Sequence, residues 1–162
     1  MRQRTLSACF VVLVTVVPVV LGTAILLALL LVVTIQAARE LTRGFSRSLP
    51  LSLSSATVTI PAAILLVVTF FTTSGTILLA TSVAALFFPF AWYAHVDDLQ
   101  HGLRAALTTS FGALYLGLPL SSALALRSLE GEMTSEWIRA LARVAGNEQT
   151  ALGLAWIGWA IA

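Results

Sequence analysis

Two histidines and two aspartates fall within seven residues of this sequence, at His95, Asp97, Asp98 and His101. Imidazole and carboxylate groups suit divalent metal ions, so this cluster could hold one. No second cluster elsewhere in the sequence offers further ligands, and a polar loop between two apolar segments has the same composition. Metal binding at Asp97 and Asp98 is therefore a hypothesis that stands beside the simpler interpretation of a connecting loop.

Three arginines form the second chemically suggestive group. Arg39, Arg43 and Arg47 follow a long apolar segment at intervals of four residues. In a helix, Arg39 and Arg43 lie one turn apart on the same face. Their guanidinium groups either anchor the chain by reaching for the membrane headgroups or bind the phosphate of an anionic lipid. These three residues are the candidates for binding a lipid headgroup.

Apart from these two groups, the sequence contains no recognisable catalytic motif. It contains no lysine, and all nine basic residues are arginine. It has no Gly-rich phosphate loop, no zinc-ligand spacing and no nucleophile elbow. Catalysis needs a convergent set of polar groups, and we therefore expect no catalytic residue on this chain.

The elements that position these residues are strongly apolar. Of the 162 residues, 59% are hydrophobic and 10% charged, against about 25% charged residues in a soluble domain. Because backbone polar groups in lipid must be satisfied within the segment, such a chain crosses the membrane as helices. The sequence predicts an all-α, polytopic integral membrane protein with five to six transmembrane segments, the last one incomplete.

The first apolar run, residues 8–38, is too long for one ordinary span. At 1.5 Å per residue it measures about 46 Å, against roughly 30 Å of hydrocarbon. It is either one tilted helix or a hairpin that turns near Pro18 and Gly22. A hairpin places Arg2, Arg4 and the three later arginines on one side of the membrane, which the positive-inside rule makes cytoplasmic. We favour the hairpin, with a cytoplasmic amino terminus in the cell's inner (plasma) membrane.

The remaining segments complete a single membrane domain over residues 1–162. Proline is tolerated in a first helical turn, where we expect Pro61. Pro89 is expected to kink its helix, with a neighbouring helix satisfying the carbonyl that it frees. Gly112 and Gly117 are expected to let helices approach closely. The expected segments are short spans at about 6–21, 23–38, 57–71, 76–94 and 103–126, an interfacial helix at about 136–145 and a partial span at 149–162.

The order of these features resembles a known family. The opening MRQRTLSA leads to an apolar run that ends QAAREL, and FGALYLGLPL follows at residues 111–120. After a polar insert, a second apolar run ends WIGWA. This progression is similar to the amino-terminal half of bacterial phosphatidate cytidylyltransferases, also called CDP-diglyceride synthases. The YLGLP stretch is its most specific part.

The resemblance implies an enzyme that joins CTP to phosphatidate, giving CDP-diacylglycerol and pyrophosphate, with Mg²⁺ at a cavity facing the cytoplasm. In the family, the acidic metal ligands lie in the carboxyl-terminal half. We therefore expect this chain to be an amino-terminal part that is inactive alone. The alternative is a non-catalytic membrane scaffold or assembly subunit. Expected partners are membrane lipids, phosphatidate, CTP, and a second copy or partner subunit. Nucleic acid is not expected, because the net charge is only +2.

Overall fold

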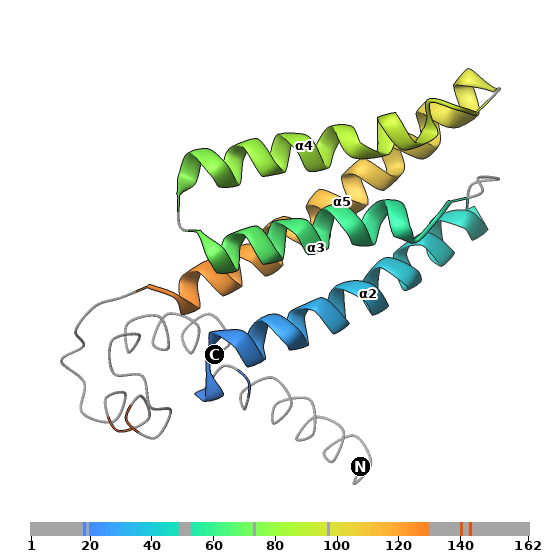
Figure 1. Ribbon diagram of the computed structural model, residues 1–162. Coiled ribbons are helices and arrows are strands. Elements are labelled where there is room, and N and C mark those ends of the chain that lie inside the picture. Colours follow the sequence, from blue (N-terminus) through green and yellow to red (C-terminus); the bar gives the residue numbers. More distant parts are fainter. Residues whose placement is uncertain are drawn as a thin grey trace, which may run out of the picture. The chain divides into compact units, whose positions relative to one another are not determined.

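The computed structural model describes residues 18, 20–48, 53–72, 74–96, 98–129, 140 and 143. Across these residues it contains four helices and no strand: α2 (Thr23–Ser48), α3 (Ala56–Phe71), α4 (Gly75–Tyr93) and α5 (Leu99–Arg127) (Figure 1). Helices α2, α4 and α5 are long and apolar enough to cross a membrane, whereas α3 has 16 residues. The predicted all-helical architecture is confirmed for this part of the chain. The expected segments at 6–21, 136–145 and 149–162 fall almost entirely outside it.

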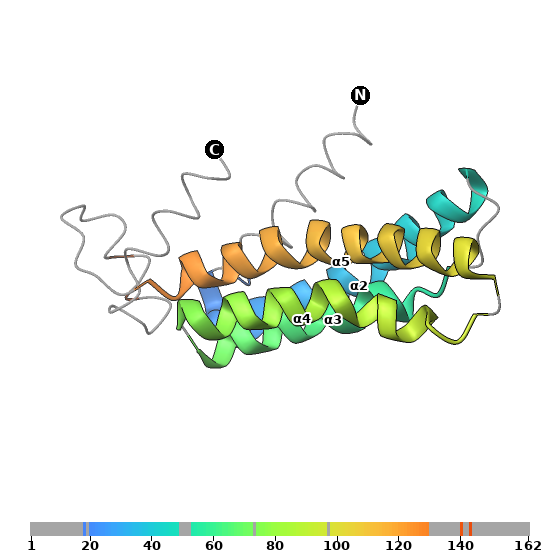
Figure 2. The ribbon, with the colours of Figure 1, turned by 90° about the horizontal axis from the view of Figure 1, so that it is seen from above.

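The chain forms two compact units, Leu30–Ser122 and Met1–Leu29 with Ala123–Ala162. The first unit contains most of all four helices. Within it, α3 lies between α4 and α2, and α5 runs along one face of this layer (Figures 1 and 2). Helix α5 approaches α2 and α3 at Gly112 and is bonded to α4 through Ser110, and α3 supplies the large buried side chains of Leu65 and Leu66.

Helix α2 begins directly after a glycine. Gly22 has a φ of 135°, a conformation that glycine adopts without the steric penalty of a Cβ atom. The predicted hairpin turn lies here, but its first arm is outside the described residues. Helix α2 then continues to Ser48, ten residues beyond the expected span. Its charged end, which carries Arg39, Arg43 and Arg47, is a regular helix.

Helix α3 starts at Ala56, one residue before the expected bound. At its start, the Ser54 hydroxyl accepts the Ala56 N–H at 3.3 Å, and the Ser54 carbonyl accepts the Thr57 hydroxyl at 2.6 Å. Pro61 is the sixth residue of the helix, so it lies in the second turn and the expected first-turn position was wrong.

Helix α5 packs through small residues, as predicted. A Cβ atom added to Gly112 would lie 2.8 Å from Leu41 Cδ2 on α2 and 3.4 Å from Val58 Cγ2 on α3. The corresponding atom at Gly117 would lie 2.8 Å from Leu65 Cδ1. Large side chains point outward instead, among them Phe111 and Tyr115, which are exposed and stacked at 5.7 Å. Small residues inside and large apolar residues outside suit a helix bundle in lipid.

Candidate lipid-headgroup site

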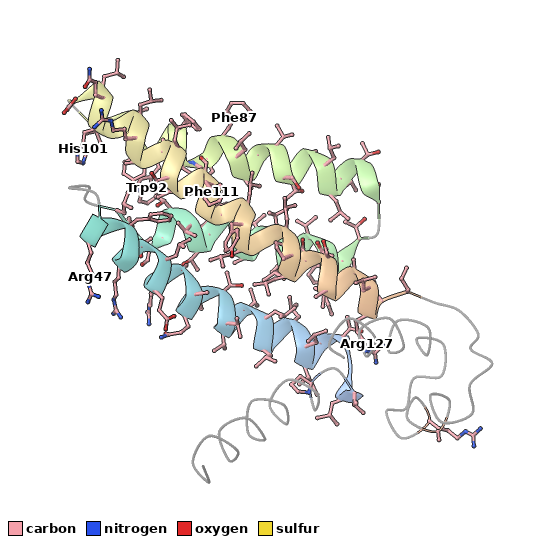
Figure 3. The ribbon with its side chains drawn as sticks, turned by 180° about the vertical axis from the view of Figure 1, so that it is seen from behind. Arg47, Phe87, Trp92, His101, Phe111 and Arg127 are labelled. Carbon is pink, nitrogen blue, oxygen red and sulfur yellow. The ribbon has the colours of Figure 1, made fainter. Side chains whose placement is uncertain are left out.

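The arginine stripe, Arg39, Arg43 and Arg47, lies along one face of the last three turns of α2. All three side chains are exposed, and Arg47 points away from the helices (Figure 3). The neighbouring Glu40 carboxylate accepts a hydrogen bond from the Gln36 amide at 3.1 Å. Within residues 20–48, 53–72, 74–96 and 98–129, no side-chain hydrogen bond or ion pair engages the three guanidinium groups. The stripe is a row of charges available to an external anion.

The same end of the Leu30–Ser122 unit carries the start of α3 and the end of α4. The Tyr93 hydroxyl accepts the backbone N–H of Ser54 at 3.2 Å, which joins these two points. Beside it, the rings of Phe88 and Trp92 pack at 5.9 Å. Aromatic side chains with a polar atom gather where hydrocarbon meets headgroups. Trp92 and Tyr93 are therefore of the residue types that are typical of a membrane boundary.

Asp98, one of the two weak metal candidates, caps a helix. Its Oδ1 accepts the N–H groups of Gln100 at 3.0 Å and His101 at 3.3 Å, at the first turn of α5. This is the usual role of an aspartate at a helix N-cap. Asp97, the other candidate, lies outside the described residues. No three His, Cys, Asp or Glu side chains in the described part could hold a metal ion together. Helix capping accounts for Asp98, and metal binding by the pair stays a hypothesis.

The proline within α4 has a partner on α5. Pro89 lacks the N–H that would bond to Ala85, and its ring disturbs the preceding turn. The buried Ser110 hydroxyl donates to the Leu86 carbonyl in that turn at 2.8 Å. A neighbouring helix thus supplies a donor in this turn, but its acceptor is not the Ala85 carbonyl that Pro89 frees, so this bond does not confirm the expectation. The sequence does not single out Ser110, because nothing local marks a serine whose acceptor is 24 residues away.

Arg127 is the last residue of α5, and its side chain is buried. An arginine at the end of an apolar helix ordinarily extends toward the headgroups, so the sequence carries no signal for this burial.

The described residues bring together exposed guanidinium groups, interfacial aromatic rings and an apolar outer surface. This combination suits the anionic headgroup and the acyl chains of a phospholipid. It contains no nucleophile paired with a base, so no covalent chemistry follows from it. No protein-family model, no curated protein and no solved structure matches this chain.

Proposed function

We propose that this chain is the membrane-embedded part of a phosphatidate cytidylyltransferase, which converts CTP and phosphatidate to CDP-diacylglycerol and pyrophosphate. The observation that supports this most is the arginine stripe, exposed beside apolar helices at the end marked by Trp92 and Tyr93. The sequence resemblance supplies the reaction. The proposal includes five to six spans, an inner-membrane location and a cytoplasmic amino terminus.

The arginine stripe contributes to this function by binding the phosphate of the substrate, and it takes no part in forming or breaking covalent bonds. Guanidinium groups form paired hydrogen bonds with phosphate oxygens, and phosphatidate presents a phosphate at the membrane surface. The resemblance assigns the Mg²⁺ ligands to the family's acidic signature, which this sequence lacks. Mg²⁺ would neutralise phosphate charge during the transfer. A polypeptide that carries the signature must supply those ligands.

The test measures CDP-diacylglycerol made from radiolabelled CTP and phosphatidate in membranes. The 162-residue chain is compared with the same chain joined to the carboxyl-terminal half of a family member. We expect product only from the joined chain. The matched control replaces an acidic metal ligand in the added half, which should abolish the product. Product from the 162 residues alone, or none from an expressed and folded joined chain, would contradict the proposal.

A non-catalytic membrane subunit is a second candidate, and α4 favours it. Of the 19 residues of α4, only Ala85 and Pro89 are buried, so most of its apolar surface is open to another helix. If the joined chain is inactive, this candidate predicts that a particular membrane enzyme loses abundance when the chain is deleted. Unchanged abundance of the cell's membrane enzymes would reject it.

A further inference from the structure

Contacts within the Leu30–Ser122 unit fix how deep each arginine lies in a membrane. Gly112 of α5 approaches both Leu41 of α2 and Val58 of α3. These three residues therefore lie at about the same height along the axes of their helices, here called the Gly112 level. From Val58, α3 runs to Phe71, about 20 Å further at 1.5 Å per residue. The chain then turns at Thr72 and re-enters a helix at Gly75.

The turn sets one boundary, and bilayer thickness sets the other. The polar groups of the turn cannot lie in hydrocarbon unsatisfied, so the turn is at or beyond a boundary. The hydrocarbon is about 30 Å thick. The opposite boundary is therefore at least about 10 Å past the Gly112 level, in the direction of the charged end. Helix tilt would only move it further.

Three markers on three helices agree with that boundary. Arg47 is about 9 Å past the Gly112 level along α2, and Arg104 is about 12 Å past it along α5. The hydrogen bond from Ser110 to Leu86 fixes the height of α4 relative to α5. Counted from Leu86 along α4, Trp92 therefore lies at about the height of Arg104. Arginine and tryptophan are typical residues of a headgroup boundary.

Arg39 and Arg43 lie inside this boundary. Arg43 is about 7 Å and Arg39 about 13 Å below it on the hydrocarbon side, measured along α2. Both guanidinium groups are exposed. A cation at that depth extends toward the headgroups or meets a counter-charge, water or a displaced headgroup. Glu40, the nearby carboxylate on α2, accepts a hydrogen bond from Gln36 and offers one negative charge for the two guanidinium groups.

We infer that Arg39 and Arg43 form a site that draws the phosphate of an anionic phospholipid below the plane of the surrounding headgroups. Two guanidinium groups one helical turn apart can hold one phosphate from two sides. The acyl chains of the same lipid find apolar surface on α2, where Val32 and Ile35 are exposed. The inference rests on the membrane placement in the proposed function, and it is independent of cytidylyl transfer.

The test measures the selectivity of the protein for lipids at its surface. The full chain is reconstituted in phosphatidylcholine vesicles with trace spin-labelled phosphatidic acid, and the motionally restricted fraction is measured. Spin-labelled phosphatidylcholine is the reference. We expect the double variant Arg39→Gln/Arg43→Gln to lose the selectivity about fivefold or more, given the usual contribution of a basic residue near an anionic bilayer. The control Arg104→Gln removes an exposed arginine on α5 that lies outside the stripe, and it should lose less than half of it.

Each other outcome contradicts the inference. Equal losses in Arg39→Gln/Arg43→Gln and in Arg104→Gln would mean a general attraction of anionic lipid by surface charge, and no loss in the double variant would mean no site. Competition by inorganic phosphate or CTP in the buffer would identify a site for aqueous anions. If the glutamine variants fail to fold, Arg39→Lys/Arg43→Lys keeps the charges but loses the paired hydrogen bonds. That variant should also lose selectivity, and an unchanged value would overturn the site. A CTP-dependent assay is not involved, so failure of the enzyme proposal remains a separate result.

Discussion

At the scale of single residues, most hydroxyl groups in the described helices donate a hydrogen bond to a backbone carbonyl of their own helix. Thr34, Thr42 and Thr69 are buried, and each donates to the carbonyl four residues earlier at 2.7 to 2.9 Å. These bonds remove the penalty of a bare hydroxyl in apolar surroundings. Such local bonds follow from sequence once a helix is expected. Ser110 is different because its acceptor lies on another helix, and no local pattern predicts that pairing.

The bond from Ser110 to Leu86 can be measured by substitution. Ser110→Ala should lower the free energy of unfolding in detergent by about 1 kcal/mol, since hydrogen bonds between membrane helices contribute that order. The measurement is a thermal or denaturant unfolding curve that follows helix content. Ser122→Ala is the control, because its exposed hydroxyl donates only within α5.

A double-mutant cycle with Pro89→Ala tests the reason for the bond. Alanine restores an N–H in α4, so the turn around Leu86 should depend less on Ser110. The loss on Ser110→Ala should then shrink. A loss of the same size in both backgrounds would show that Ser110 does not serve the proline.

At the scale of elements, the sequence indicates where helices exist better than where they end. Apolar runs predicted helices over the segments that α2 to α5 occupy, and Gly22 marked the start of α2. The end of α2 was missed because exposed charged residues are compatible with either helix or loop. The second-turn position of Pro61 could have been read from the sequence, because Pro61 is the fifth residue of the expected 57–71 segment and a helical turn has only 3.6 residues.

Close packing of α5 on α3 gives a prediction at this scale. Gly117→Val should destabilise the protein by about 1–3 kcal/mol, the usual range for overpacking. The reason is that the new side chain would meet Leu65 Cδ1, with the Ala62 backbone only 3.3 Å from the added Cβ. Gly44→Ala is the control, because nothing lies within 4 Å of its added Cβ. It should instead stabilise α2 by up to about 1 kcal/mol. Equal effects in unfolding experiments would refute this packing.

At the scale of the whole chain, charge is asymmetric along the helices. In the described part of the Leu30–Ser122 unit, every charged residue lies on the last turns of α2 or near the start of α5. The turn between α3 and α4 has none. This asymmetry can be predicted from the sequence, and the positive-inside rule assigns the charged end to the cytoplasm. The depth of each arginine in the membrane cannot be predicted in this way, because it depends on which residues of neighbouring helices lie at the same height.

Sidedness of α4 tests most directly the claim that these helices cross a membrane with the arginine end in the cytoplasm. Single cysteines are introduced by Gly75→Cys or Gln100→Cys, each in a Cys9→Ser background. A membrane-impermeant maleimide is then applied to right-side-out vesicles. We predict labelling at position 75 in sealed vesicles, and at position 100 only after permeabilisation. Labelling of both positions under the same condition, or the reverse pattern, would contradict the account.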